Sequence, residues 1–127
     1  MKSVQATYPV HDLIAERWSP RAFAEQSVTD HEIGSLLEAA RWAPSCYNEQ
    51  PWRFLVAKAS DPDLFERFAD CLLDGNSWAK RAPVLMIAVA RTTFEQSEKE
   101  NRHAWHDVGL AVENLVLQAE ALGLATH

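Results

Sequence analysis

The clearest periodic stretch of the chain begins after Thr29. Apolar residues recur there at positions i, i+3, i+4 and i+7: Ile33, Leu36, Leu37 and Ala40. This spacing predicts an amphipathic helix. Thr29 and Glu32 have the spacing of a capping box at its start, and Pro44 prevents its continuation. A shorter apolar repeat predicts a helix over Val10 to Glu16 that leads into Arg17.

A second helix is expected where Asp61-Pro62 occurs. Asp is a common N-cap residue, and Pro suits the first helical position because its missing N–H would be unpaired there anyway. The apolar residues that follow fall on one helical face: Leu64, Phe65, Phe68 and Leu72. Gly75 is expected to end this helix.

The last periodic stretch, about Ala104 to Leu122, is apolar around most of its circumference. A helix with that pattern is expected to be buried. Gly123 stands where a glycine commonly ends a helix, because glycine adopts a positive φ at little cost. The residues Leu124 to Thr126 have the character of the start of a strand.

Two short apolar runs predict strands. Phe54 to Ala57 follows Pro51, and Val84 to Val89 follows Pro83. The second run is apolar on both pleat faces, so we expect a central strand covered by helices on two sides. The charged residues 91–102 are expected to form a solvated loop. Helices alternating with buried strands predict a layered α+β or α/β domain, and spacing alone leaves these two classes open.

Composition restricts the classes of protein to which the chain can belong. With 127 residues, 47% of them hydrophobic, it can bury the core of a single domain over residues 1–127. The formal net charge of −6 argues against nucleic acid as a partner, since phosphate contacts need a basic surface. The chain has two cysteines, no apolar leader and no apolar run near the roughly 20 residues of a membrane span. We therefore expect a cytoplasmic protein that does not enter a membrane.

Arg17 and Arg21 lie four residues apart with Ser19 between them. Two guanidinium groups and a hydroxyl at this spacing can converge on one phosphate. Ser19 could also cap a turn that starts at Pro20, which would point backbone N–H groups the same way. The alternative is a solvated pair of arginines beside a turn, and spacing alone leaves both interpretations open.

The segment APSCYNEQPWRF places Ser45, Asn48 and Gln50 in a loop between two prolines. Amide side chains offer a donor and an acceptor, which is what the polar edge of a flavin ring requires. Trp52 and Phe54 would anchor the loop from below. The alternative is an ordinary turn whose amides bond to the backbone, and the residues alone leave this open.

Other common sites find no support in the sequence. His103, His106 and Asp107 lie close together, but no compact third and fourth ligand follows, so we expect no metal site. The four glycines form no Gly-x-Gly-x-x-Gly or Walker segment, which argues against a Rossmann or P-loop nucleotide site. No constellation of catalytic side chains is expected either.

The segments RWSPRAF and APSCYNEQPWRF, in this order with a helix between them, resemble the nitroreductase family of flavoproteins. The resemblance implies that Arg17, Ser19 and Arg21 hold the phosphate of FMN. Trp18 occupies a position that is often basic or polar in the family, and Cys46 stands where another serine is common. The family's loop approaches the flavin bound mainly by the partner subunit. It matches Pro44, Ser45, Asn48, Gln50, Pro51 and Trp52, and Cys46 lies within the same flavin-binding segment.

Weaker matches concern later residues. Asn76 and Lys80 lie near family positions that contact the polar edge and ribityl chain of the flavin. The segment HDVGLAVENLVLQAEALGL resembles the family's long helix, which builds the core of a homodimer. The implied fold is α+β, a three-layer α/β/α sandwich with a central mixed sheet, of which the C-terminal part would lie beyond residue 127.

The resemblance implies an FMN-dependent oxidoreductase. Hydride would pass from NAD(P)H through the flavin to a nitro-aromatic, a quinone or a similar small acceptor, and no protein acid or base is strictly required. Dehalogenation or a specialised dehydrogenation uses the same scaffold. The alternative from another class is a shortened, non-catalytic member that serves as an FMN-binding or protein-interaction module. Because known members are longer, we expect residues 1–127 alone to be marginally stable and weak in FMN binding.

Overall fold

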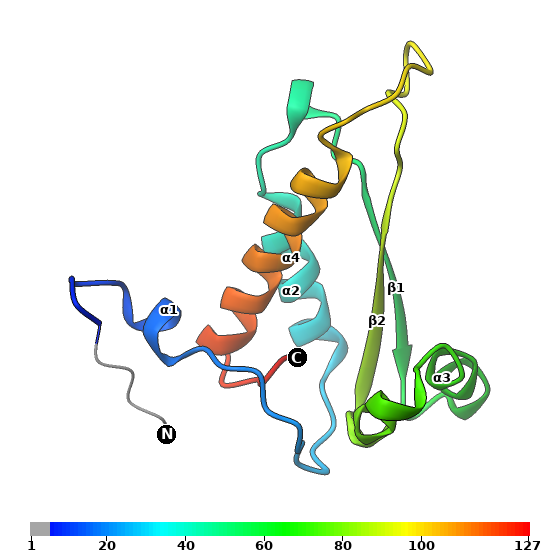
Figure 1. Ribbon diagram of the computed structural model, residues 1–127. Coiled ribbons are helices and arrows are strands. Elements are labelled where there is room, and N and C mark those ends of the chain that lie inside the picture. The colour runs from blue at the N-terminus through cyan, green and yellow to red at the C-terminus, as the bar shows by residue number, and fades with distance from the viewer. Residues whose placement is uncertain (1–5) are drawn as a thin grey trace.

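A computed structural model describes residues 6–127 of the chain (Figure 1). Residues 1–5 lie outside the described part of the chain. They begin the N-terminal stretch in which the sequence predicts no apolar leader. The two short elements η1 and η2 are 3₁₀ helices. In chain order the elements are α1 (Asp12–Glu16), α2 (Asp30–Arg41), η1 (Cys46–Asn48), β1 (Trp52–Lys58), α3 (Pro62–Ala69), η2 (Asp74–Arg81), β2 (Val84–Ala90) and α4 (Ala104–Ala121).

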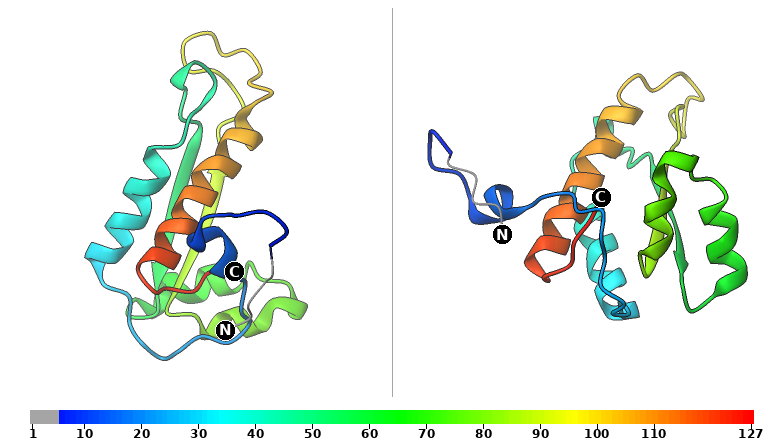
Figure 2. Two further views of the ribbon diagram at one scale, coloured as in Figure 1. Left: turned by 90° about the vertical axis from the view of Figure 1, so that its left-hand side faces the viewer. Right: turned by 60° about the horizontal axis from the view of Figure 1, so that its bottom comes forward.

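The elements form three layers (Figures 1 and 2). Strands β1 and β2 pair antiparallel, in a register that sets Trp52 opposite Ala90 and Lys58 opposite Val84. Helix α3 packs on one face of this pair, and α4, with α2 beside it, packs on the other. The expected α+β sandwich with helices on both sides of the sheet is thus confirmed. Within residues 6–127 the sheet has two strands, so the central position expected for β2 and the pairing of a mixed sheet have no counterpart there.

The core lies where α2, α4 and β1 meet. Alanines at the contact let the two helices approach closely, and larger side chains fill the space beside the sheet. Two side-chain hydrogen bonds also join the helices: Asn114 Nδ2 donates to the Ala39 carbonyl at 3.2 Å, and Gln118 Nε2 donates to Ser35 Oγ at 3.1 Å. The buried cluster consists of Leu36, Ala40, Ala43, Trp52, Val108, Ala111, Leu115 and Ala119.

The predicted capping box of α2 is confirmed. The Thr29 hydroxyl accepts a hydrogen bond from the Glu32 N–H at 3.2 Å, and the Glu32 carboxylate accepts one from the Thr29 N–H at 2.7 Å. Glu32 also accepts a hydrogen bond from the Thr29 hydroxyl. The hydrogen bond from the Thr29 hydroxyl has the larger effect on the pKa of Glu32, and the bond from the Thr29 N–H adds to it. Both hold this pKa below its ordinary value, because they favour the charged carboxylate.

The other predicted helix ends are also formed. Asp61 accepts a hydrogen bond from the Leu64 N–H and caps α3, whose first residue is Pro62. Gly123 has a φ of 71° at the end of α4. There the Leu124 N–H donates to the Ala119 carbonyl at 2.8 Å and the Gly123 N–H donates to the Glu120 carbonyl at 3.0 Å. This pair of bonds is a Schellman motif.

Three predicted boundaries are wrong. Helix α1 begins at Asp12, two residues after Val10, because His11 caps it by accepting from the Leu13 N–H. Helix α3 ends at Ala69, where short i→i+3 bonds tighten the chain, and Gly75 falls inside η2. Residues 124–126 form no strand, because the Leu124 N–H donates to the Ala119 carbonyl at the end of α4.

Helix α4 is less completely buried than its composition predicts. Four of its buried residues belong to the core shared with α2 and β1: Val108, Ala111, Leu115 and Ala119. Trp105 is 68% exposed, and Leu122, the residue that caps the C-terminal end, is 40% exposed. No helix among residues 6–127 combines the length and apolar character that crossing a membrane needs.

Candidate functional site

The arginine segment, residues 17–21, runs between α1 and α2 past the C-terminal end of α4 (Figure 1). Arg17 Nη1 donates to Ser19 Oγ at 3.2 Å, so the guanidinium and the hydroxyl are brought together as the sequence predicts. His127 Nδ1 lies 3.3 Å from the Ser19 carbonyl and 3.2 Å from the Pro20 carbonyl. No helical turn begins at Pro20, so Ser19 caps none. Trp18 is exposed.

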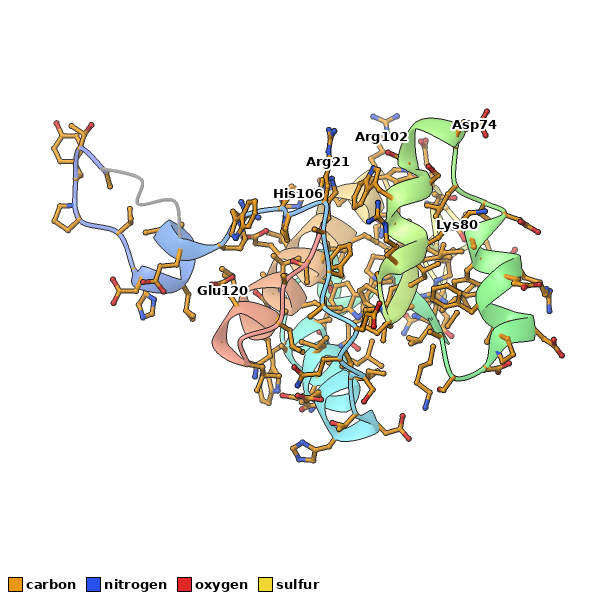
Figure 3. The ribbon with its side chains drawn as sticks, turned by 90° about the horizontal axis from the view of Figure 1, so that it is seen from below. Arg21, Asp74, Lys80, Arg102, His106 and Glu120 are labelled. Atoms are coloured by element: carbon orange, nitrogen blue, oxygen red, sulfur yellow. The ribbon has the colours of Figure 1, made fainter. Side chains whose placement is uncertain are left out.

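Arg21, labelled in Figure 3, borders an aromatic cluster. The Arg21 guanidinium lies 6.0 Å from the ring centre of Trp78, which belongs to η2. Trp78 stacks on Phe23 at 6.2 Å between ring centres, and it packs edge-to-face with His127 at 4.5 Å between ring centres. Sequence reasoning missed this contact, since nothing near Arg21 in the chain indicates a partner on η2.

The two arginines have no acidic partner within residues 6–127. The salt bridges of this part of the chain involve other cations: Arg41, Lys58, Arg91, Arg102 and His106. Arginine remains charged at any physiological pH, and a protein with a net charge of −6 offers many carboxylates. Within residues 6–127, Arg17 is bonded to Ser19, and neither Arg17 nor Arg21 forms a salt bridge with a carboxylate.

Asn76 and Lys80 belong to η2, as Trp78 does, but their side chains point in other directions. A 3₁₀ helix has three residues per turn, so positions 76, 78 and 80 point to three different sides. Both polar side chains are exposed, and Lys80 lines a separate hollow together with Asp30 and Lys58. The structure thus brings Trp78, rather than Asn76 or Lys80, against the arginine segment.

The amide loop, residues 44–51, has an unusual backbone. Tyr47, Asn48 and Gln50 have φ values of 53°, 55° and 48°, in the left-handed region that residues other than glycine rarely adopt. Ser45 Oγ accepts from the Gln50 N–H at 2.9 Å, and Gln50 Nε2 donates to Asn48 Oδ1 at 2.9 Å. This leaves the Asn48 amide N–H groups as donors and Gln50 Oε1 as an acceptor for a ligand.

Distant residues hold the amide loop in place. The Cys46 N–H donates to Asp107 Oδ2 at 2.9 Å, from the first turn of α4. The Glu49 carboxylate accepts from the Arg91 guanidinium and from the Glu95 N–H. Sequence reasoning considered Asp107 only as a metal ligand, because a partner 61 residues away leaves no local signal.

The predicted anchor below the amide loop is confirmed. Pro51 is fully buried, Trp52 belongs to the core, and Phe54 packs against it. Pro44 is exposed, whereas Ser45 and Cys46 are half-buried. The loop thus stands on a rigid base while its tip faces outward.

The two candidate regions lie at opposite ends of α4 (Figure 1). The amide loop is bonded to its first turn, and the arginine segment is bonded to His127 beyond its last turn. A helix of 18 residues is about 27 Å long at roughly 1.5 Å per residue. Within one chain, the two regions are therefore separated by about the length of that helix.

An apolar cavity of about 380 Å³ lies beside the arginine segment. Phe23 and Trp78 border it on that side, Met86 lines it from β2, and Val112 and Val116 line it from α4. It could exclude water from one side of a bound planar molecule.

Comparison with known proteins places these features in a family. The model of the nitroreductase family matches residues 14–80 and 72–127, which together span nearly the whole chain. The chain belongs to the nitroreductase family. A crystal structure described as an oxidoreductase containing FMN is similar to this nitroreductase-family chain, with a TM-score of 0.87 and 39% identity. The match covers 94% of this chain and 62% of the chain in that crystal structure.

Two further relatives show the same relation. A protein of Desulfovibrio desulfuricans in complex with FMN has a TM-score of 0.71 and 32% identity, covering 92% of this chain and 65% of its own. A protein of Archaeoglobus fulgidus, whose name joins NADH dehydrogenase and NAD(P)H nitroreductase, is 29% identical over 115 residues, 90% of this chain and 63% of its own. The chain thus spans less than two thirds of the length of these relatives.

Proposed function

We propose that this member of the nitroreductase family binds FMN and acts as part of an FMN-dependent oxidoreductase. The observation that carries the proposal is the pair Arg17 and Arg21, which have no acidic partner in residues 6–127, with Ser19 bonded to Arg17. Two arginine forks and a hydroxyl suit a phosphate dianion, because each guanidinium can donate two parallel hydrogen bonds.

The amide loop supplies the complementary chemistry for a flavin ring. The free N–H groups of Asn48 and the free Oε1 of Gln50 provide donors and an acceptor for the carbonyl and imide groups of the ring edge. The hydrogen bonds that Asp107, Ser45 and Arg91 make to the loop hold these groups before a ligand arrives, which lowers the entropy cost of binding. Under the same proposal, Asn76 and Lys80 of η2 would contact the polar edge and the ribityl chain of the flavin.

When bound, FMN would supply hydride transfer from NAD(P)H to a small acceptor such as a nitro-aromatic or a quinone. The names of relatives, including an NADH dehydrogenase/NAD(P)H nitroreductase, support this reductant and this class of acceptor. The chain's own residues would then serve for binding, orientation and water exclusion, and no acid–base group is assigned. The free cysteines Cys46 and Cys71 suit the reducing cytoplasm that we propose as its location.

We further propose that the functional unit is a homodimer. The amide loop and the arginine segment of one chain lie about one helix length apart, which favours an FMN held by the arginines of one copy and met by the loop of another. The exposed apolar residues Trp105 of α4 and Leu122 at its C-terminal cap would gain burial in such a contact.

Titration of the purified protein with FMN tests this function. The wild type is expected to bind FMN weakly and to quench its fluorescence, and Arg17→Ala and Arg21→Ala should each weaken binding by roughly 1.5–3 kcal/mol, the size of a charge-assisted hydrogen bond. Arg67→Ala, in the last turn of α3 on the other side of the sheet, is the matched control and should bind normally. Unchanged affinity in both arginine variants would remove the phosphate assignment.

Two further measurements on the same samples address oligomeric state and activity. Light scattering should give a dimer whenever FMN is bound, and a flavin-saturated monomer would contradict the shared site. NAD(P)H oxidation should depend on added FMN and acceptor. A protein that quenches no flavin fluorescence and oxidises no NAD(P)H at saturating FMN would instead favour a protein-interaction module.

A further inference from the structure

Asp107 is a carboxylate buried inside the protein. Its side chain belongs to the first turn of α4, and the residue is only 3% exposed. Among residues 6–127 it shares this buried polar character with Asn101 alone. A buried charge is costly unless hydrogen bonds compensate it, so the partners of Asp107 indicate what it is there to do.

The partner of Asp107 on the inside is the backbone of the amide loop. Oδ2 accepts from the Cys46 N–H at 2.9 Å, and Oδ1 lies 3.2 Å from Nδ1 of His106, which is itself exposed. Cys46 opens η1, the single 3₁₀ turn that presents Asn48. The position of Asp107 near the N-terminus of α4 also stabilises its negative charge, since the helix dipole is positive there.

The amide loop needs such an external tether. Tyr47, Asn48 and Gln50 adopt backbone conformations that cost energy, and such conformations persist only where surrounding contacts hold them. Inside the loop, the Asn48 N–H donates to the Ser45 carbonyl and the Gln50 N–H donates to Ser45 Oγ. Outside it, Glu49 fastens the far end to Arg91, and Asp107 fastens the near end just before the first left-handed residue.

We propose that Asp107 is a positioning residue that holds the amide loop in the conformation in which Asn48 and Gln50 meet the flavin. It touches no ligand and acts through the Cys46 N–H. The flavin part of this inference rests on the proposed function, whereas the tether itself is a property of the protein without ligand. The two parts therefore need separate measurements.

The first measurement is amide hydrogen exchange of the protein without FMN. Asp107→Ala should raise the exchange rate of the Cys46 amide at least roughly tenfold, because a protected N–H loses its acceptor. The amides of Leu55 and Ala57 in β1, which face β2 in the antiparallel register, should keep their rates, which shows that the fold is intact. Asp107→Asn retains an acceptor oxygen and should restore most of the protection. Unchanged Cys46 exchange in Asp107→Ala would overturn the proposal.

Two controls separate the tether from other properties of α4. His106→Ala removes the exposed partner of the same carboxylate, and Glu113→Gln removes an exposed acidic group from the same helix. Both should leave Cys46 exchange unchanged. Equal acceleration in Glu113→Gln would mean that Cys46 reports general loosening of the helix, and the proposal would fall.

The second measurement is a double-mutant cycle on FMN affinity. Gln50→Ala and Asp107→Ala should each weaken binding by roughly tenfold, the size of one hydrogen bond. The double variant should bind nearly as well as Asp107→Ala alone, because a misplaced Gln50 contributes nothing that can be lost. Additive effects would mean that Asp107 does not act through the loop, and Asp107→Asn should again recover most of the affinity.

The two measurements fail in different ways. If the wild type binds no FMN, the proposed function fails, and the Cys46 exchange rates still decide whether Asp107 holds the loop. If FMN binds and responds to Arg17→Ala but not to Asp107→Ala, the function stands and the positioning role is excluded.

Discussion

The amide loop and the arginine segment are held in different ways. The loop is fixed by residues far away in the sequence, with Asp107 bonded to Cys46 and Arg91 bonded to Glu49. The arginine segment has a local bond between Arg17 and Ser19, the contact of Arg21 with Trp78, and two carbonyl contacts to His127. Its charged groups remain exposed or half-buried and unpaired by carboxylates in the described part of the chain.

This difference reflects what each region would recognise. A phosphate is met by charge at several angles, so exposed flexible arginines suffice. A ring edge is met by donors and acceptors at defined positions, so the loop must be rigid before binding. Weakening the base of the loop should therefore affect stability strongly, whereas changes near the arginine segment should affect stability little.

Trp52→Ala should give the largest effect. Trp52 is 7% exposed and connects the end of the amide loop to the core formed by α2 and α4. Truncating a buried Trp leaves a large cavity, so the free energy of unfolding should fall by about 3–5 kcal/mol. Urea denaturation measures it. Leu55→Ala, half-exposed on the same strand, is the matched control, and an equal loss there would contradict the anchoring role.

Glu49→Ala should have an intermediate effect. It leaves the Arg91 guanidinium and the Glu95 N–H without their shared acceptor, while Arg91 Nε already has no hydrogen-bond partner. The free energy of unfolding should fall by about 1–3 kcal/mol, which is the usual cost of leaving buried polar groups without a hydrogen-bond partner.

The control for Glu49 is Glu100→Ala, which removes an exposed pair with Arg102 at 3.8 Å. An exposed pair of this kind contributes about 1 kcal/mol or less. If thermal denaturation gave the two variants the same loss, Glu49 would be an ordinary surface carboxylate and the loop would depend on Asp107 alone.

Much of the fold could be predicted from the sequence because its signals are local. The capping box at Thr29 and Glu32, the cap at Asp61 and the stop at Gly123 depend on residues within one turn of each other, and all three are formed. The end of α3 and the course of residues 124–126 could not be predicted, because they depend on which backbone hydrogen bonds close each helix end, and the residue pattern does not reveal that choice.

The candidate site divides in the same way. Spacing alone identifies Arg17, Ser19 and the amide loop as candidate ligand-binding groups. The structure joins Arg17 to Ser19 by a hydrogen bond. Their roles toward a flavin remain predictions. Asp107, Arg91 and Trp78 could not be found, since each acts on a residue that is far away in the chain. Pairing across such separations is a property of the folded topology.

Of these three substitutions, Thr29→Ala should have the smallest effect on stability. Its effect should depend on pH. Thr29 follows the arginine segment and caps α2, so its loss should cost about 1 kcal/mol at neutral pH. Hydrogen bonds from Thr29 lower the pKa of Glu32 below 4.5, so the stability they contribute is present above that pH and is lost as the pH falls through the folded pKa. The difference between wild type and variant should therefore shrink in acid without vanishing, because the Thr29 hydroxyl still accepts from the Glu32 N–H. Urea unfolding at pH 7 and near pH 3 measures it, with Ser27→Ala, on the exposed approach to the same helix, as the control. A difference that stays constant or grows in acid would show that the Glu32 carboxylate does not belong to the cap in solution.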